Sequence, residues 1–577
     1  MKQNIHSPKR YFLVFVLLFG LLASFGFVDR YFEIAKNLDT FASLFRQLNN
    51  HYVEEVTPGD LMKEGIDAML GSLDPYTEFV PESEIEDFRM NYVSKQYAGI
   101  GALIFNQSGK VVVSEPYEGF SAHKADIRAG DEILTINGIS VVGKNSSTVT
   151  ELLKGQKGTA LKIVVQRVGE ARPLEKQLLR ETISFPNVPY YGLINDSTGY
   201  IKLDKFLENA AQEVRDALLT LKEKHKVTSL VLDLRGNGGG IVQESVNIVN
   251  LFVDKGQDIV SQKGRFKERD IVYKAAFTPI DSRMPLVVLV DRGSASASEI
   301  VAGAIQDLDR GTIIGQRTFG KGLVQQTLSL PYNSLLKVTV AKYYTPSGRC
   351  IQALDYSHRN ADGSVSKISD SLMTEFKTRH GRSVYDGSGI HPDLPTAEKH
   401  YNNISYSIVN KQLHFDFATQ YRATHPTLAA ARSFKMSEAD YQAFVKFLSN
   451  KDYSYTTRSE KNLQELKAIA IKEKYFDSIK DEYTALEHKL QQNKKDDLIR
   501  YKDEIRELLE EEIASRYYFQ SGKLEASFKS DDDLKEAVRV LNDKKLYATI
   551  LKGEGAYKTI GKPVAFAKPG TSAETKN

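Results

Sequence analysis

The sequence holds a single cysteine, no tryptophan and, between His225 and His358, no histidine. The lone Cys350 excludes a disulfide within the chain and a cysteine-based metal cluster. No spacing of His, Asp and Glu suggests a metal site, and we expect no cofactor. A nucleophile in the histidine-free stretch has no nearby imidazole to act as its base, so a lysine becomes the natural candidate.

Neither sign of charge is in excess. The chain carries 77 basic and 74 acidic residues, which gives a net charge of +3. These charges are mostly interspersed, as on an ordinary solvated surface, and we expect no nucleic acid as a partner. With 577 residues, the chain is long enough for several domains that each bury a core.

The N-terminus has the pattern of an export signal over residues 1–28. Lys2, Lys9 and Arg10 precede an apolar run over 11–28, and nothing in that run gives it a polar face. The run is at the short edge for a membrane-spanning helix, and Ala23-Ser24-Phe25 is a poor cleavage site. A cleaved signal peptide and an inner-membrane anchor therefore both remain open. In either case we expect the bulk of the chain in the periplasm.

Residues 30–90 have a helical pattern. Apolar residues recur there at spacings of three and four, which is the period of one helix face; they are Leu38, Phe41, Leu44, Phe45 and Leu48. Pro58 and Pro75 interrupt the pattern. We expect a short helical cap before the next domain.

Residues 91–182 are β-rich, and Ala129–Gly138 resembles the strand-turn signature of PDZ domains. A domain of this kind binds an extended C-terminal peptide along a sheet edge, and backbone N–H groups of a glycine-containing loop capture the carboxylate. The loop expected to do this consists of Tyr97, Ala98, Gly99, Ile100 and Gly101. The alternative is a closed groove, in which case the domain serves only as a spacer.

Residues 183–396 alternate strand and helix patterns. The apolar runs 229–234 and 286–290 indicate buried strands, and 241–252 and 300–305 indicate helices between strands. This alternation predicts an α/β core with its site residues at strand ends.

A serine-rich turn follows the second of those strands. It places Ser294, Ser296 and Ser298 directly before a helix-like apolar run, and Ser261 is a more distant fourth candidate. Lys321 stands between two glycines, twenty-five residues after Ser296. Serine-lysine pairs are a known variant of the nucleophile-base arrangement. To accept a proton the lysine must be neutral, which requires lowering its pKa from ~10.4 to roughly 7–8 by burial.

These motifs together resemble the carboxy-terminal processing (tail-specific) serine peptidases. The run VDRGSASASEIVAGAIQD at 290–307, followed by GQRTFGKGLVQQ at 315–326, is similar to the active-site signature of that family. Four further matches occur in the expected order: LDPYTEFVP at 73–81, LVLDLRGNGGG at 230–240, KYYTPSGRCIQ at 342–352 and GIHPD at 389–393. The resemblance covers roughly residues 30–395.

The resemblance implies a role for each residue of the candidate site. Ser296 matches the nucleophile, Lys321 the general base, and Gln325 the glutamine that holds the lysine by a hydrogen bond. Gln325 and Lys321 are neighbours if the segment is helical and roughly 13 Å apart if it is extended. The geometry stays open at this point, and Gln326 is the competing assignment.

The resemblance also implies an oxyanion hole. Its N–H donors would be those of Ala297 and of either Gly239 or Gly240, and glycine at the latter positions lets the backbone approach a substrate closely. The PDZ-like domain departs from the family at two positions. Asp126 stands where the family usually has glycine, and Phe120 where it often has a small residue.

The C-terminal part of the chain is less informative. Residues 356–388 resemble a polar insertion, and 397–566 have helical periodicity, as in Phe476, Ile479 and Tyr483. Ser530-Asp531 is a candidate cap for a helix starting near Leu534. These helices could bind an adaptor or mediate self-association, and 567–577 has the composition of a disordered tail.

The sequence therefore predicts a multi-domain α/β plus β fold, in which a PDZ-like domain precedes an α/β Ser-Lys protease core, between a helical N-terminal cap and a helical C-terminal extension. By resemblance, the function is that of an exported serine endopeptidase that cleaves proteins near their C-termini. Its partners would be protein or peptide substrates with free C-termini. The alternatives are a catalytically silent PDZ scaffold and a serine esterase or acyltransferase.

Overall fold

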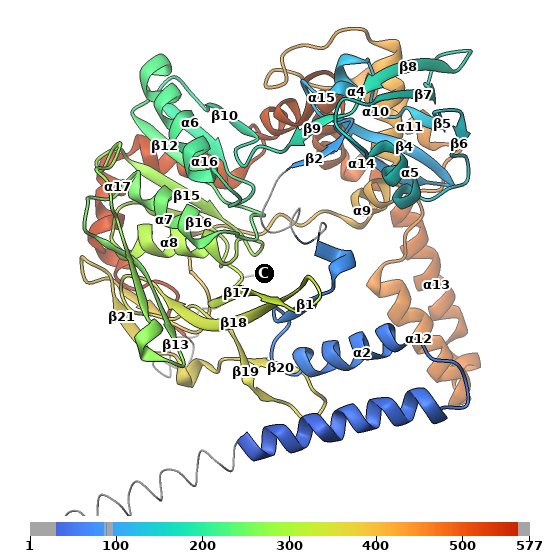
Figure 1. The fold of residues 1–577 in the computed structure, drawn as a ribbon. Coiled ribbons are helices and arrows are strands. Elements are labelled where there is room, and N and C mark those ends of the chain that lie inside the picture. The colour runs from blue at the N-terminus through green and yellow to red at the C-terminus, as the bar shows by residue number, and fades with distance from the viewer. Residues whose placement is uncertain (1–30, 86–87, 89–95, 564–577) are drawn as a thin grey trace, which may run out of the picture. The chain divides into compact units, whose positions relative to one another are not determined.

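A computed structural model of the chain describes residues 31–85, 88 and 96–563 (Figure 1). The apolar run over 11–28 and the predicted tail over 567–577 lie outside the described residues. None of the described helices combines the length and the apolarity that a membrane crossing requires.

The chain divides into two compact units. The first is Met1–Phe79 with Leu336–Val338, and the second is Val80–Leu335 with Thr339–Asn577. The described part of the first unit contains a helix over 31–51 and α2 (Pro58–Gly71), followed by β1 (Glu78–Val80). Pro58 is the first residue of α2, where its missing N–H costs nothing because that N–H has no helical partner.

The PDZ-like domain in the second unit is a six-stranded sheet in the order β3-β4-β5-β7-β8, with β6 paired to β5. β3 lies at an edge of this sheet, and α5 packs beside it. β2 and β9 pair antiparallel at the two ends of the domain. The elements are β2 (Gln96–Gly99), β3 (Ala102–Gln107), β4 (Lys110–Pro116), α4 (Ser121–Lys124), β5 (Glu132–Ile136), β6 (Ile139–Ser140), α5 (Ser146–Leu153), β7 (Ala160–Gln166), β8 (Leu174–Leu179) and β9 (Glu181–Ser184).

The α/β core is built on a second six-stranded sheet, in the order β10-β11-β12-β15-β16-β23. β10 is antiparallel to β11, and all other neighbours are parallel. The two runs predicted as buried strands are β12 and β15, and the two predicted helices are α7 and α8, so these expectations are confirmed. The elements are β10 (Tyr190–Leu193), β11 (Thr198–Lys202), α6 (Ala210–His225), β12 (Ser229–Asp233), α7 (Val242–Asn250), β15 (Leu286–Val290), α8 (Ala297–Asp307), β16 (Thr312–Gly315) and β23 (Leu394–Pro395).

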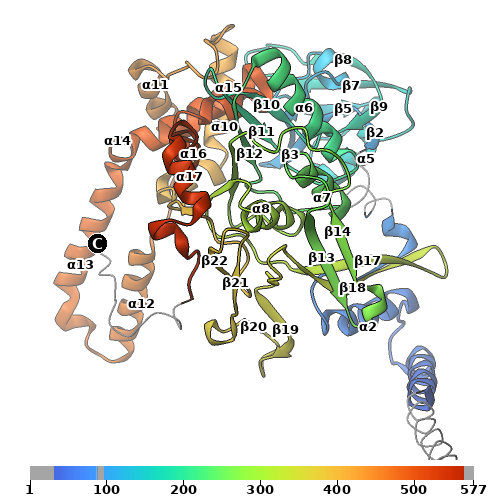
Figure 2. The ribbon, with the colours of Figure 1, turned by 90° about the vertical axis from the view of Figure 1, so that its left-hand side faces the viewer.

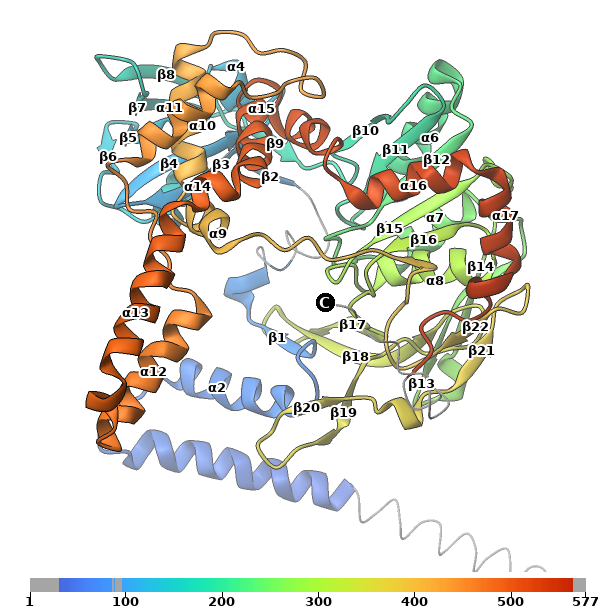
Figure 3. The same cartoon turned by 180° about the vertical axis from the view of Figure 1, so that it is seen from behind.

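The two faces of this sheet are covered by different parts of the chain. Because successive strand residues point to opposite faces, Leu230 and Leu232 pack with α6, α7 and α8. Val231 and Leu289 face the other way and pack with α16 (Asp532–Asn542) and α17 (Lys544–Lys552). Figure 3 shows α16 and α17 alongside the strands of the sheet. The C-terminal segment therefore supplies the second helical layer of the core.

A smaller sheet carries the long hairpin β17-β18. β18 pairs with β17 and β13, β14 pairs with β13, and β1 lies beside β18. Two short hairpins, β19-β20 and β21-β22, occupy the region predicted as a polar insertion. The elements are β13 (Asp258–Gly264), β14 (Ile271–Lys274), β17 (Leu323–Leu330), β18 (Ser334–Tyr344), β19 (Leu354–Arg359), β20 (Val365–Lys367), β21 (Glu375–Lys377) and β22 (Ser383–Tyr385).

Of the remaining C-terminal helices, α9, α10, α11, α14 and α15 share an apolar core, which includes Phe417, Phe444, Leu509 and Ile513. The other two, α12 and α13, form an antiparallel pair (Figure 2). The elements are α9 (Asn403–Asn410), α10 (Leu413–Thr424), α11 (Glu438–Leu448), α12 (Arg458–Lys472), α13 (Phe476–Lys495), α14 (Asp497–Arg500) and α15 (Lys502–Ser527). The helical periodicity predicted for this part of the chain is confirmed.

The packing of α16 on the sheet yields a stability prediction. Leu534 is 2% exposed and packs in the cluster on the second face. Leu534→Ala should lower the free energy of unfolding by about 2–5 kcal/mol, because it removes buried methyl groups and leaves a cavity. Urea denaturation measures the change. Lys535→Ala, on the solvent side of the same helix, is the control, and equal stability of the two variants would contradict the placement of α16.

Candidate active site

Three neighbouring parallel strands deliver the predicted site residues to one edge of the core sheet. β12 ends at Asp233 and leads into the glycine turn Gly236–Gly240, while β15 ends at Val290 and leads into the serine turn. β16 ends at Gly315, ahead of Lys321. The carboxyl ends of parallel strands meet at the same edge, which is where α/β proteins place their sites.

Ser296 sits immediately before α8 in a strained conformation. Its φ is 56° and its ψ is −114°, in a region that a residue with a Cβ rarely adopts. Its side chain is only half-buried, although Ala297 behind it is fully buried. Backbone strain of this kind persists only where the surroundings hold it, and it is common at functional turns.

The other serines of the turn are used structurally. The Ser294 hydroxyl donates to the Leu234 carbonyl at 2.9 Å, and the Ser298 hydroxyl donates to the Asn237 carbonyl at 2.8 Å. Both side chains are fully buried. Ser261, the fourth candidate, belongs to β13. Ser296 is therefore the one serine of this turn that is not fully buried.

The buried carboxylate of Glu299 connects the serine turn to the lysine loop. One of its oxygens accepts from the Ser296 N–H at 2.8 Å and from the Lys321 N–H at 2.9 Å. The other accepts from the Thr318 hydroxyl at 2.5 Å and the Gly320 N–H at 2.7 Å. Burial raises the pKa of Glu299, while these donors act in the opposite direction. Four donors on four lone-pair positions are what an ionised carboxylate can satisfy.

Tyr343 makes a second connection between the same two residues. Its hydroxyl lies within hydrogen-bond distance of the carbonyl oxygens of Ser296 and Lys321. Lys321 itself is half-buried, with Leu323 and Val324 buried after it in the chain, while Phe319 is 50% exposed. Glu299 thus connects the N–H groups of Ser296 and Lys321, and Tyr343 connects their carbonyl groups.

Gln325 and Gln326 lie on β17, so the extended alternative for this segment is the one that the structure adopts. Gln325 is half-buried and its amide donates to the Thr339 hydroxyl at 3.1 Å, whereas Gln326 is exposed. The role of Gln325 as a partner of Lys321 stays a prediction.

Asn237 binds the glycine turn to the serine turn. Its carbonyl accepts from the Ala295 N–H at 3.0 Å, and its side-chain oxygen accepts from the Gly239 N–H at 2.9 Å. A Cβ on Gly239 would lie 2.7 Å from the Cβ of Ser296 and 2.9 Å from the Ala297 nitrogen, so only glycine fits there. In this conformation the Gly239 N–H is occupied by Asn237.

The residues predicted to capture a peptide carboxylate lie at the start of the PDZ-like domain. Tyr97, Ala98 and Gly99 belong to β2, and Ile100 is buried beside them. Gly101 has a φ of 72°, and a Cβ there would lie 2.4 Å from that of Phe120. The large residue that departs from the family pattern thus packs directly on this loop.

The second departure has a local explanation. Asp126 adopts a φ of 54°, a left-handed conformation that aspartate tolerates better than most residues. Its carboxylate pairs with Arg167 at 2.9 Å and Lys176 at 3.0 Å. Although burial opposes it, hydrogen bonding to these cations holds the pKa of Asp126 well below its usual range.

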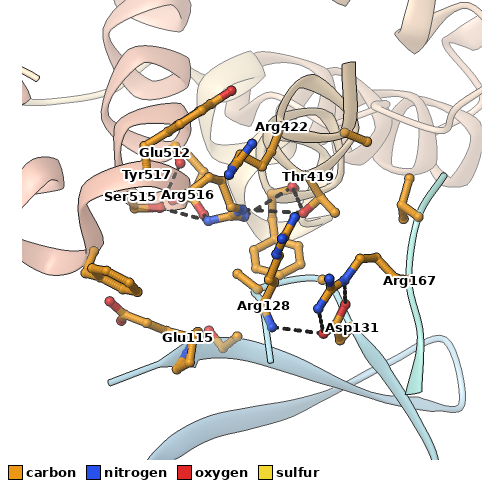
Figure 4. A pocket seen from close by; sticks show the side chains of 18 of the residues that line it. Glu115, Arg128, Asp131, Arg167, Thr419, Arg422, Glu512, Ser515, Arg516 and Tyr517 are labelled. Carbon is orange, nitrogen blue, oxygen red and sulfur yellow. Dashed lines mark hydrogen bonds and ion pairs between the residues drawn. The ribbon is translucent and has the colours of Figure 1, made fainter. Parts of the chain in front are cut away.

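A cleft of about 900 Å³ separates the PDZ-like domain from the C-terminal helices (Figure 4). Phe105 of β3 meets Phe415 of α10 edge to face at 5.2 Å, and the Gln107 amide donates to Asp416 at 2.8 Å. Within the cleft, Arg516 and Lys523 outweigh burial and lower the pKa of Glu512 to about 2. The contact between the two parts therefore includes both an aromatic pair and a polar contact.

Within the described residues no grouping of His, Cys, Asp or Glu has the form of a metal site. Three residues of the candidate active site were missed by sequence reasoning: Glu299, Tyr343 and Asn237. Each acts through contacts with segments that are distant in the chain.

Three family models match the chain in the order of its domains. "PDZ domain" matches residues 112–167, "Peptidase family S41" matches 197–356, and "Probable PDZ-protease, C-terminal helical domain" matches 404–541. The carboxy-terminal-processing protease of Bartonella bacilliformis is 34% identical over 323 residues, which cover 55% of this chain and 73% of the relative. The chain belongs to peptidase family S41, the carboxy-terminal-processing proteases.

The chain is also similar to a second curated relative and to a solved structure. A probable CtpA-like serine protease of Staphylococcus haemolyticus is 32% identical over 379 residues, covering 65% of this chain and 68% of the relative. Among solved structures, a photosystem II D1 C-terminal processing protease is 33% identical with a TM-score of 0.32, covering 54% of this chain and 89% of that one. The predicted fold class and the predicted enzyme class, a serine-type endopeptidase, are confirmed by family membership.

The bridge through Glu299 can be tested directly. Glu299→Gln replaces one acceptor oxygen by a donor, so either the N–H groups of Ser296 and Lys321 or the donors at Thr318 and Gly320 lose their partner. Each unsatisfied buried donor costs about 1–3 kcal/mol, and displacement of the turn should lower kcat at least about 10-fold. Thermal unfolding and steady-state kinetics measure the two effects.

The matched control for this substitution is Glu213→Gln in α6. Glu213 also accepts a backbone N–H, that of Val188, at 3.0 Å. The Glu213→Gln variant should be less stable than the unaltered enzyme but should have the same kcat. A fully active Glu299→Gln variant would show that the bridge does not position the site.

Proposed function

We propose that this family member is an exported endopeptidase that uses Ser296 and Lys321 as a catalytic dyad to cleave proteins near their C-termini. The observation that carries the proposal is the Glu299 carboxylate, which accepts from the N–H of both residues. The basic residues and apolar run at the N-terminus support export.

The reaction begins with a neutral Lys321. Its amine takes the proton of the Ser296 hydroxyl as the oxygen attacks the scissile carbonyl. The tetrahedral intermediate collapses when Lys321 returns the proton to the leaving amine, and an acyl-enzyme remains on Ser296. Water, deprotonated in turn by Lys321, attacks the ester, and Lys321 returns that proton to the Ser296 oxygen as the second product leaves. Gln325, on β17, would keep the amine oriented where a bend at the glycines beside Lys321 brings the amine back towards it, because an extended segment alone would hold the two residues apart.

The oxyanion needs two N–H donors at the serine turn. Ala297 is the first residue of α8, and its N–H lacks a helical partner, so it can meet the developing charge together with the dipole of the helix. The second donor would come from the glycine turn. Asn237 accepts the Gly239 N–H, which favours Gly240 unless the turn shifts on substrate binding.

The PDZ-like domain would bind the free C-terminus of the substrate. β3 offers an edge of the sheet, with α5 beside it, for an added peptide strand. The contact with the C-terminal helices is partly polar, of the kind that domains can separate, so peptide binding could shift the domain and align the dyad. An adaptor or a second copy bound to the C-terminal helices remains part of the same proposal.

The first test removes the two reacting groups. Ser296→Ala and Lys321→Ala should each reduce cleavage of an unstructured protein with an apolar C-terminus by at least about 1,000-fold, with folding intact. Ser261→Ala, a serine of β13, serves as the control and should cleave normally. Cleavage that survives both dyad substitutions would remove the mechanism. Ester turnover without peptide cleavage in the unaltered enzyme would favour an esterase.

The second test concerns the substrate carboxylate. The same peptide substrate is supplied with a free or an amidated C-terminus, and KM is measured for both. If backbone N–H groups at Tyr97–Gly101 capture the carboxylate, amidation should raise KM about 10-fold or more, because a charged hydrogen bond is lost. Equal kinetics for the two peptides would support a closed groove that acts only as a spacer.

A further inference from the structure

The C-terminal helix α16 contacts the residue that directly precedes the glycine turn. Asp531, which caps α16, accepts from both terminal nitrogens of Arg235, at 2.9 Å from Nη1 and 2.7 Å from Nη2. Asp533 accepts from Nη1 at 3.0 Å. The two acidic residues lie about 300 positions after Arg235 in the chain, yet both of their carboxylates accept hydrogen bonds from its guanidinium.

The remaining side of the guanidinium is held by its own strand. Arg235 Nε lies 3.1 Å from both carboxylate oxygens of Asp233, and Nη2 donates to one of them at 2.6 Å. Asp233 is 1% exposed and also accepts from the Tyr200 hydroxyl at 2.6 Å. Three carboxylates therefore converge on one guanidinium at the end of β12.

This cluster lies where it can control the glycine turn. Arg235 is followed at once by Gly236, whose N–H donates to Asp291, the first residue of the serine turn, at 2.9 Å. Gly236, Gly239 and Gly240 all have positive φ, so the turn has little stiffness of its own. Its position depends on the anchors at its ends and on Asn237.

Docking of α16 does not itself require the acidic residues. Its apolar residues Leu534, Ala537 and Val540 are buried on the second face of the core sheet. Burying charge is costly, and replacing a whole ion pair with well-packed apolar side chains is often neutral for stability. Asp531 also caps α16 through its Oδ1, but that cap gives Asp533 no role, so the contacts of both acids with an arginine already paired with Asp233 call for a further explanation.

We propose that Asp531 and Asp533 are positioning residues for the peptidase reaction. By binding the Arg235 guanidinium, they keep the glycine turn in the position where the N–H of Gly240 meets the developing oxyanion. This rests on the proposed function. The C-terminal segment then completes the active site of this chain, in addition to covering its sheet.

The test compares Asp531→Asn/Asp533→Asn with Asp532→Asn. Asp532 stands between the two acids, but its side chain is 86% exposed and pairs with Lys535. Five quantities are measured on the full chain: kcat, KM, the inhibition constants of a peptide aldehyde and of the matching alcohol, and the midpoint of thermal unfolding. The peptide is taken from the N-terminal side of a mapped cleavage site. Ser296 adds to the aldehyde carbonyl and generates an oxygen in the oxyanion hole, whereas the alcohol binds without reacting.

The double variant should lose about 10- to 100-fold in kcat with KM unchanged, because misplacing a donor affects the transition state alone. Affinity for the aldehyde should fall by a similar factor, and affinity for the alcohol should not change. Asp532→Asn should behave as the unaltered enzyme. Wild-type kcat and aldehyde affinity in the double variant would overturn the proposal. So would equal losses for aldehyde and alcohol together with a lower unfolding midpoint, which is the pattern of a purely structural role.

If the double variant does not fold, Asp533→Asn alone removes a single contact of 3.0 Å. It should show a smaller loss in kcat and in aldehyde affinity, and values equal to those of the unaltered enzyme would overturn the proposal as well. Ser296→Ala separates the two levels of inference. If it remains active, the dyad itself fails; if it is inactive while the double variant keeps full activity, only the role of Asp531 and Asp533 fails.

Discussion

The candidate active site depends on one buried carboxylate. The sheet brings the serine turn and the lysine loop to the same edge, but both are irregular segments whose positions the strands alone do not determine. Glu299 supplies the missing constraint, since its two oxygens accept four hydrogen bonds, two of them from the N–H groups of Ser296 and Lys321. Moving either residue would strand a donor beside a buried charge, which is expensive in the protein interior.

The same logic recurs around the site. Asn237 joins the glycine turn to the serine turn, and Tyr343 places its hydroxyl between the carbonyls of Ser296 and Lys321. The positive φ of Ser296 persists because these contacts hold the turn from several sides. In this member of peptidase family S41, the second face of the supporting sheet is covered by α16 and α17, so the C-terminal segment belongs physically to the core.

The sequence predicts those parts of the fold that are determined by residues close together in the chain. β15 is a continuous apolar run, β12 has three apolar residues at its centre, and α16 has its cap at Asp531, so these elements could be recognised from neighbouring residues. The surface on which α16 packs could not be predicted, because an apolar helix face does not specify what will cover it. The candidate nucleophile and base were found through their motifs. The role of Glu299 was missed, although it stands in the same motif, because its partners at 318–321 are set by tertiary contact. The segment of Gln325 was left open between helix and strand, since the glycines beside Lys321 permit either.

Trapping the covalent intermediate tests the central claim most directly. The enzyme is mixed with an activated ester of a substrate peptide, quenched in acid within the first turnover, digested and analysed by mass spectrometry. The account predicts one acyl group, on the peptide that contains Ser296, and a much lower yield with Lys321→Ala. An acyl group on another residue, or equal labelling of Ser296 in the Lys321→Ala variant, would contradict it.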